Sequence, residues 1–345
     1  MEKKKIFMMR AIQLAKNGLG STYPHPMLGC VIEKNGKIIS ESWFDNQKNE
    51  LPIEQAINRM KDKDLLKKST LYITLEFYFS YQNFYNGINL IIKNKLSKVI
   101  IGIKNPFYKF NNLGKELKKY GVIVIENFLK YECYHLNKRF FTFYEKKRPY
   151  IILTWSQSID GFIFFPYGKN TLTSDKYCIE LFSKWKIEEN SFLIGKKNLN
   201  RKLINWNNVH SIQIFFDQKL SITNRFFLFN EKLRTIIFSE KKKNDKENVE
   251  YIQISFKKNM IEKVLKFLYQ KKIQSFIINE ENKIIKSFLK KNIWDECRIT
   301  TFNIYLSNGI LSPKVKGLMY KKININRTIS ICILSHDNKI NFVYK

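Results

Sequence analysis

Apolar residues in the first half of the chain occur alternately at helical spacing and in short runs that are typical of strands. Helical spacing over residues 6–16 predicts an opening helix, and an Asn-Gly turn at 35–36 predicts a hairpin between apolar segments at 27–33 and 37–43. The pattern then predicts helices at 52–61, 88–95 and 114–119, a helix that ends near Tyr144, and strands at 71–75, 98–103 and 122–125. Alternation of this kind is typical of a layered α/β domain with a largely parallel part to its sheet.

A charged joint that contains a proline, Glu-Lys-Lys-Arg-Pro at 145–149, separates this half from a new strand of buried type at 150–156. We therefore divide the chain into domains at 1–146 and 147–345. The second domain repeats the α/β alternation. Its predicted strands lie at 192–194, 211–216, 235–238, 251–254, 275–278 and 298–302, and its predicted helices at 175–187, 258–270 and 283–291.

Composition agrees with two folded domains. The 345 residues are 44% hydrophobic and 15% aromatic, which is typical of a globular protein. A formal net charge of +31 would fit a nucleic-acid or anionic membrane partner, but the basic residues are mostly lysines spread along the whole chain. We interpret them as a solvated surface and expect no nucleic-acid partner. No apolar run approaches the roughly 20 residues of a membrane span, so we also expect no membrane partner.

The cysteines favour a reducing compartment. There are five, widely spaced and never in a Cys-x-x-Cys pair, so they form neither a disulfide framework nor a zinc knuckle. Cys30 lies along a predicted core strand and is expected to be a small buried apolar residue. No signal-peptide pattern follows the first residues, and the sequence therefore predicts a cytoplasmic protein.

Short segments along nearly the whole chain carry a more specific pattern. They are Met-Arg-Ala-Ile-Gln-Leu-Ala at 9–15, Pro-His-Pro-Met-Leu-Gly-Cys-Val-Ile at 24–32, Thr-Leu-Glu at 74–76, Arg-Pro-Tyr-Ile-Ile-Leu at 148–153, Ser-Gln-Ser-Ile-Asp-Gly at 156–161, Phe-Leu-Ile-Gly at 192–195 and Leu-Lys-Lys-Asn-Ile-Trp-Asp-Glu at 289–296. In this order they resemble the bifunctional riboflavin biosynthesis family, in which a pyrimidine deaminase is fused to a pyrimidine reductase.

The resemblance implies a fold and an activity. The fold would be α/β, with a cytidine-deaminase-like α/β/α domain followed by a dihydrofolate-reductase-like α/β domain. The family deaminates a small phosphoribosylated diaminopyrimidinone and then reduces the ribose of the product with NADPH. The resemblance also implies zinc in the first domain and a homodimer through the reductase domain.

The residues that should hold zinc are missing. The family binds the metal with one histidine and two cysteines, but Phe77 and Tyr78 stand at the Pro-Cys positions that follow Thr-Leu-Glu. The second cysteine should fall near 86–87, where there is none, and the segment 50–57 contains no histidine. Phe44 stands where a histidine is common, and His25 is expected to be a local substitution. The sequence therefore predicts neither bound zinc nor deamination.

Glu54 is the candidate proton shuttle of the deaminase-like domain. It takes the family's glutamate position if one residue is deleted after it, whereas an alignment without a gap puts Ile53 there. The competing interpretation of Glu54 is an exposed glutamate on a helix surface.

The cofactor site of the reductase-like domain is also altered. The family's Glu-Gly-Gly turn reads Asn279-Glu280-Glu281 here, and a carboxylate 4 Å from a phosphate charge costs about 1 kcal/mol in water and about 4 kcal/mol at an intermediate dielectric constant. Thr154 replaces a usual lysine, and Ile179 replaces an arginine expected to meet the substrate phosphate. The remaining candidates for binding NADPH are Ser156, Ser158, Asp160, Gly161 and Gly195, which could equally serve only turn and strand geometry.

Two hypotheses follow. The first is an enzyme of riboflavin biosynthesis with altered sites, no deaminase activity, and a reductase activity that has to be tested. The alternative is a non-catalytic remnant or scaffold that partners an intact riboflavin enzyme. Binding of NADPH discriminates between them.

Overall fold

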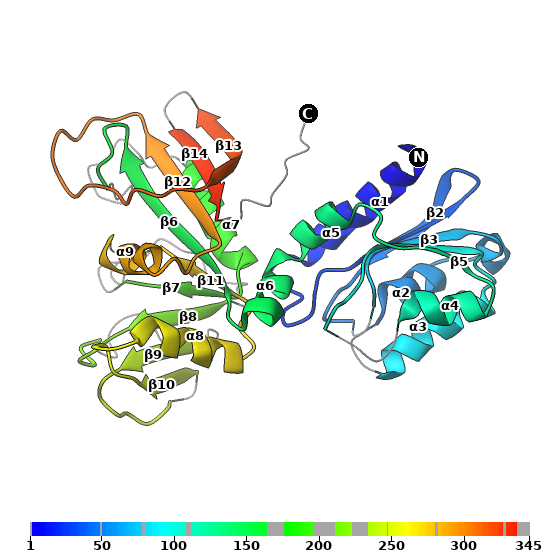
Figure 1. The fold of residues 1–345 in the computed structure, drawn as a ribbon, viewed down its shortest axis with the longest axis horizontal. Helices are drawn as coiled ribbons and strands as arrows, with labels where there is room; N and C mark the ends of the chain where they lie inside the picture. Colours follow the sequence, from blue (N-terminus) through cyan, green and yellow to red (C-terminus); the bar gives the residue numbers. More distant parts are fainter. Residues whose placement is uncertain are drawn as a thin grey trace. The chain divides into compact units, whose positions relative to one another are not determined.

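The computed structural model divides the chain into two compact units, Met1–Glu145 and Lys146–Lys345 (Figure 1). It describes residues 2–48, 50–77, 81–107, 112–163, 176–195, 211–222, 234–246, 248–279, 282–326 and 329–336. The predicted site residues Tyr78, Glu280 and Glu281 and the side chain of Ile179 lie outside the described residues.

The first unit is a five-stranded sheet with helices on both faces. Its helices are α1 (Glu2–Ala15), α2 (Pro52–Asn58), α3 (Tyr81–Lys93), α4 (Leu113–Lys119), α5 (Lys130–Leu136) and α6 (Lys138–Lys146), and its strands are β1 (Gly29–Lys34), β2 (Lys37–Trp43), β3 (Thr70–Leu75), β4 (Lys98–Ile103) and β5 (Ile123–Ile125). The strand order is β2-β1-β3-β4-β5, antiparallel around β1 and parallel from β3 to β5. Figure 1 shows α1 and α5 on one face and α2, α3 and α4 on the other.

Gly29 shows why the segment at 24–32 needs a glycine. A Cβ at this position would collide with the backbone carbonyl of Ala11, because α1 lies directly on the start of β1. The Gly29 amide also donates to Thr74 Oγ1 at 3.1 Å, which ties β1 to β3 inside the core. The segments at 24–32 and 74–76 are therefore in direct contact in the core, and close packing explains the glycine in the first of them.

The second unit is a nine-stranded sheet. Its strands are β6 (Tyr150–Ser158), β7 (Ser191–Leu193), β8 (Ile212–Phe216), β9 (Thr235–Ser239), β10 (Val249–Gln253), β11 (Ser275–Ile278), β12 (Glu296–Phe302), β13 (Leu318–Asn326) and β14 (Ile329–Ser335), and its helices are α7 (Lys176–Glu188), α8 (Met260–Gln270) and α9 (Asn282–Lys290). The order is β10-β9-β8-β7-β11-β6-β12-β14-β13, parallel from β10 to β12. The hairpin of β13 and β14 adds two antiparallel strands at one edge.

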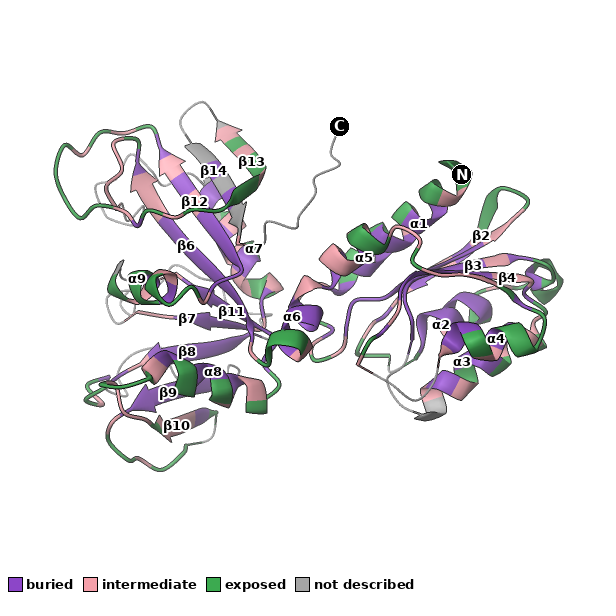
Figure 2. Ribbon diagram, in the orientation of Figure 1, coloured by how far each residue is buried: buried purple, intermediate pink, exposed green. Residues whose placement is uncertain are grey.

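Both faces of the second sheet are covered. Helices α8 and α9 bury Val264 and Phe288 against one face, and α7 buries Trp185 against Ile152 and Ile277 on the other. The central strands are therefore buried along most of their length (Figure 2). This burial explains why their sequences are nearly continuous apolar runs.

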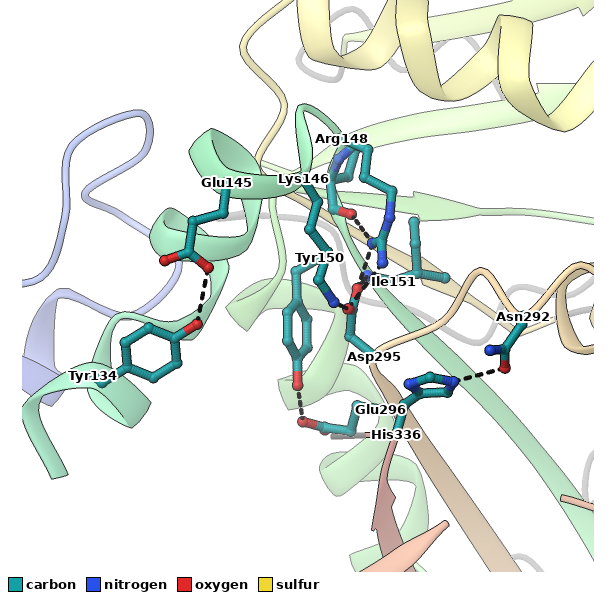
Figure 3. A network of polar contacts seen from close by, with 11 residues as sticks. Tyr134, Glu145, Lys146, Arg148, Tyr150, Ile151, Asn292, Asp295, Glu296 and His336 are labelled. Carbon is teal, nitrogen blue, oxygen red and sulfur yellow. Dashed lines mark hydrogen bonds and ion pairs between the residues drawn. The ribbon is translucent and has the colours of Figure 1, made fainter. Parts of the chain in front are cut away.

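An ion-pair network anchors the start of the second unit to the start of β12 (Figure 3). The Asp295 carboxylate accepts hydrogen bonds from Arg148 Nη1 at 2.5 Å, Lys146 Nζ at 2.7 Å and the Ile151 amide at 2.9 Å. Burial alone would raise the pKa of Asp295, but the charges and hydrogen bonds of Arg148 and Lys146 outweigh it and lower that pKa. Two of the segments that carry the family pattern, at 148–153 and 289–296, thus contact each other to fix the fold.

The structure differs from the predicted elements in a few places. Helix α3 begins at Tyr81 rather than near residue 88, because Phe84 near its start is fully buried in the core, a packing contact that local periodicity does not reveal. The hairpin of β13 and β14 was not predicted, since exposed lysines and asparagines dilute its apolar pattern. Cys30 is fully buried as expected, and burial raises the pKa of its thiol to about 12.

Candidate functional site

Phe77 fills space at the end of β3, one residue before the position at which the family resemblance would place a zinc-binding cysteine. Its ring is 1% exposed and lies against α3 at Gly87, so that a Cβ on Gly87 would collide with the ring. Gly87 belongs to the short stretch where the second cysteine was expected. The ring of Phe77 therefore occupies the space between the two stretches in which the family resemblance predicted cysteines.

The start of α2 continues this apolar filling. Leu51 and Ile53 are each 1% exposed and belong to the same core cluster as Phe77. Zinc requires nitrogen, sulfur or oxygen ligands, which these side chains do not offer. Within the described ranges, no group of three or more His, Cys, Asp and Glu side chains could hold a metal ion. The side chains that the structure describes here, those of Leu51, Ile53 and Phe77, do not fit zinc.

Glu54 lies beside this apolar filling. The side chain is half-buried and faces a cavity of about 440 Å³ between α2 and α3. The cavity is also lined by Asn86, Asn89, Leu90, Ile92 and Lys93. One carboxylate, two carboxamides and an ammonium group can hydrogen-bond a small polar molecule, but they supply no activated water. Ile53, the other candidate for the glutamate position, points into the core.

Glu76 of the Thr-Leu-Glu segment serves the fold. Its carboxylate accepts hydrogen bonds from the Leu113 amide at 2.6 Å and the Asn105 amide at 3.2 Å, and so joins the end of β3 to the segment that enters α4. Burial raises the pKa of Glu76, and the two backbone donors only partly oppose that shift. His25 packs its ring edge-on against Phe44 with centroids 5.6 Å apart.

The candidate residues of the second unit meet at one edge of the sheet. Ser156 and Ser158 end β6, and Gly195 follows β7 by two residues. Strand β11 pairs in parallel with both β6 and β7, so all three strands present their carboxyl ends on the same side. The carboxyl edge of a parallel sheet is where open α/β folds bind ligands.

Ser158, Asp160 and Gly161 are engaged in loop structure. Ser158 Oγ accepts a hydrogen bond from the Phe162 amide at 3.0 Å, and the Asp160 carboxylate accepts from the amides of Ser307 at 2.8 Å and Leu306 at 3.2 Å. A hydrogen bond from Ser158 is the main cause that lowers the pKa of Asp160, with the two amides adding to it. Gly161 adopts a φ of +84°, which glycine tolerates readily.

Arg298 is a buried residue toward the amino end of β12 that the sequence did not single out. It lies on β12 and binds Glu296 at 2.6 Å and Glu189 at 3.1 Å, with its guanidinium 4.9 Å from the centre of the Trp185 ring. The signal that could have found it is the alternation of Glu296, Arg298 and Thr300, which places three polar side chains on one face of a strand. Because two carboxylates hold it, Arg298 does not provide a free cation for phosphate.

The comparisons with known proteins cover both units. Residues 149–309 match the family model of the RibD C-terminal domain. A riboflavin biosynthesis protein RibD from Actinobacillus pleuropneumoniae is 37% identical over 156 residues, 45% of this chain and 41% of that protein. A diaminohydroxyphosphoribosylamino-pyrimidine deaminase from Buchnera aphidicola subsp. Acyrthosiphon pisum is 34% identical over 137 residues, 39% of this chain and 91% of that protein. The chain is thus aligned to less than half of the Actinobacillus protein and to nearly all of the Buchnera protein.

A solved structure matches both units together. The crystal structure of a diaminohydroxyphosphoribosylaminopyrimidine deaminase/5-amino-6-(5-phosphoribosylamino)uracil reductase from Thermotoga maritima has a TM-score of 0.82 and 24% identity, covering 97% of this chain and 99% of that one. The predicted fold class, a deaminase-like α/β/α domain followed by a reductase-like α/β domain, is confirmed. The chain belongs to the RibD family of riboflavin biosynthesis proteins.

In the part of the chain that the structure describes, no helix has both the length and the apolar character needed to cross a bilayer.

Proposed function

We propose that the chain acts in riboflavin biosynthesis through its reductase-like unit, and that its deaminase-like unit does not deaminate. The observation that carries this proposal is the contact of Phe77 with Gly87, together with the burial of Leu51 and Ile53. Apolar side chains fill the region in which the family binds its metal.

Deamination of a pyrimidine ring needs a nucleophilic water and a group that transfers protons. In a zinc deaminase the metal supplies the first. Glu54, with its carboxylate on the cavity between α2 and α3, could supply only the second. Loss of the nucleophile removes the reaction even if the proton shuttle persists, so Glu54 is proposed as the remaining member of the family's catalytic set.

For the second unit we propose a small phosphoribosylated pyrimidine as substrate and NADPH as the reductant. Ser156 and Gly195 are the proposed ligand-contacting residues, because both lie at the carboxyl edge of the parallel strands. Ser158, Asp160 and Gly161 are proposed to shape the loop beside that site, since their polar groups and backbone conformation are used in the turn. A homodimer through this unit is proposed from family membership.

One observation favours a second candidate function, a non-catalytic partner of an intact riboflavin enzyme. The Asp160 carboxylate and the Ser158 hydroxyl are both committed to hydrogen bonds within the protein. Arg298 is likewise held by two glutamates. A unit whose polar groups serve mainly its own fold would retain its structure without binding the cofactor.

Isothermal titration calorimetry of the full chain with NADPH separates these two functions. The reductase function is supported by two results. NADPH binds saturably below millimolar concentrations, and the chain restores growth of a strain that lacks the reductase. No heat of binding up to millimolar NADPH contradicts it and favours the partner role. NADH serves as the matched control ligand, because it differs only by the 2′-phosphate.

A further inference from the structure

The second unit contains a cavity of about 470 Å³ beside helix α8, which we call the α8 cavity. Its lining side chains come from α8, from residues 147–148 directly before β6, and from Ile293 before β12. Because β6 and β12 are parallel neighbours, both segments lie at the amino end of the sheet. The α8 cavity is therefore separate from the carboxyl edge where Ser156 and Gly195 lie. Its volume falls within the range of about 300–1,000 Å³ that is typical of pockets for small organic molecules.

One side of α8 forms a wall of this cavity. The wall consists of Glu262, Leu265, Lys266 and Tyr269, whose spacing of three and four residues places them on one side of the helix. Leu265 is only 5% exposed and belongs to the core under the helix, whereas Glu262 and Lys266 are exposed. The wall therefore combines an apolar base with charged groups at the surface.

Two flat side chains of the α8 cavity favour a planar ligand. Tyr269 ends in an aromatic ring and Arg148 in a planar guanidinium group, and both line the cavity. Asp295 holds the guanidinium group in place, because it accepts hydrogen bonds from Nη1 at 2.5 Å and Nη2 at 3.0 Å (Figure 3). Aromatic ligands stack favourably on tyrosine rings and on guanidinium planes. Together with the apolar side chains of Leu265 and Ile293, these groups suit an aromatic ring system.

The charges around the α8 cavity favour an anion. Three of its lining side chains are cationic and one is anionic. The anionic one, Glu262, already pairs with Lys291 at 2.6 Å, and Arg148 already pairs with a carboxylate. Lys147 and Lys266 are both exposed and give the cavity a net positive charge. Because water screens exposed charges, we expect them to select the charge of the ligand more than to supply most of its affinity.

We propose that the α8 cavity binds a planar aromatic molecule that carries one anionic group. The ring system packs against Tyr269, Leu265 and Arg148, and the anionic group lies toward Lys266 and Lys147. This binding site is additional to the proposed function in riboflavin biosynthesis. It does not rest on NADPH binding, because its lining residues lie at the other end of the strands.

Naphthoate is the probe, because it joins two fused aromatic rings to one carboxylate. Isothermal titration calorimetry of the full chain should show saturable binding below millimolar concentrations. Lys266→Glu should raise the dissociation constant about ten-fold, because an attraction is replaced by a repulsion. Lys263→Glu is the matched control, since it makes the same change of charge on an exposed residue of α8 that does not line the cavity. This control should bind naphthoate like the wild type.

Two analogues test the chemistry of the ligand. Naphthylmethanol has the same rings without the charge, and decahydronaphthoate has the charge without the aromatic rings. Each should bind about five-fold more weakly than naphthoate or worse. Tyr269→Leu should weaken the binding of naphthoate by a similar factor, because leucine keeps an apolar surface but offers no ring for stacking.

Four results would overturn the proposal. They are no saturable binding of naphthoate below millimolar concentrations, equal affinities of Lys266→Glu and Lys263→Glu, binding of either analogue as tight as that of naphthoate, and weaker naphthoate binding in the presence of NADPH. The last result would place the aromatic anion at the carboxyl edge instead. Failure of NADPH binding with naphthoate binding intact would reject only the proposed reductase function.

Discussion

The aromatic ring of Phe77 occupies the space that a side chain on Gly87 would need. This contact joins the end of β3 to α3 beside the positions at which the family resemblance predicts zinc-binding cysteines, and Phe77 is only 1% exposed. Loss of a single zinc ligand would be expected to leave the other polar ligands around an empty space. Here the apolar core extends through the region, so the packing of the whole region differs from that of a metal site.

Gly87→Ala tests this contact. The added methyl group would meet the ring of Phe77, so we expect a loss of about 1–2 kcal/mol in the free energy of unfolding, although alanine is intrinsically about 1 kcal/mol better than glycine in a helix. Urea denaturation of the full chain measures the change. Asn86→Ala is the control, because Asn86 is exposed and its replacement should change stability by less than about 0.5 kcal/mol. A Gly87→Ala protein as stable as the Asn86→Ala protein would show that Phe77 does not fill this space.

Gly29→Ala should be more harmful than Gly87→Ala. At Gly29 the new methyl group would meet the backbone of Ala11 in α1, which cannot rotate away as a side chain can. We expect a loss of about 3 kcal/mol or more, above the usual range for a point substitution. Comparing the two variants by urea denaturation checks the order. Equal stabilities would contradict the close approach of α1 to β1.

Much of the fold could be predicted from the sequence, because its main elements depend on local patterns. The opening helix, the hairpin at 35–36 and the parallel strands have clear apolar periodicity and turn residues. Helix α3 was partly missed because the burial of Phe84 depends on distant residues. The buried pairing of Arg298 with Glu189 was missed for the same reason. The two residues are 109 positions apart in the sequence, and only the folding of the sheet brings them together.

Asp295 should make the second unit sensitive to acid. Its pKa is lowered in the folded protein, so its ion pairs stabilise the fold above the unfolded-state pKa of about 3.9, and this contribution is lost as the pH falls through the folded-state value. Asp295→Asn should lose about 3 kcal/mol at pH 7, because the partly buried Arg148 loses the anion that it pairs with.

Denaturation between pH 2 and 7 measures this dependence. The stability difference between the wild type and Asp295→Asn should shrink below about pH 4. Asp64→Asn is the control, since Asp64 pairs with Lys67 on the surface with 78% of its side chain exposed. A pH-independent difference between the wild type and Asp295→Asn would contradict the assignment.

Asp160 should protect the loop at 304–307 from hydrogen exchange. Its carboxylate accepts the amides of Leu306 and Ser307, so Asp160→Ala should make both amides exchange faster while β6 and β12 remain protected. Hydrogen exchange read by mass spectrometry or NMR detects the change. Unaltered exchange of these two amides would contradict the structural role of Asp160. Asp160 would then again be a candidate for binding the ligand.

Zinc content tests the central claim most directly. The full chain is dialysed against excess zinc, separated from free metal by gel filtration and analysed by inductively coupled plasma mass spectrometry. With apolar side chains in the metal region, we predict less than about a tenth of a zinc ion per chain and no release of ammonia from the diaminopyrimidinone substrate. About one zinc ion per chain, together with ammonia release that Glu54→Gln abolishes, would contradict the account.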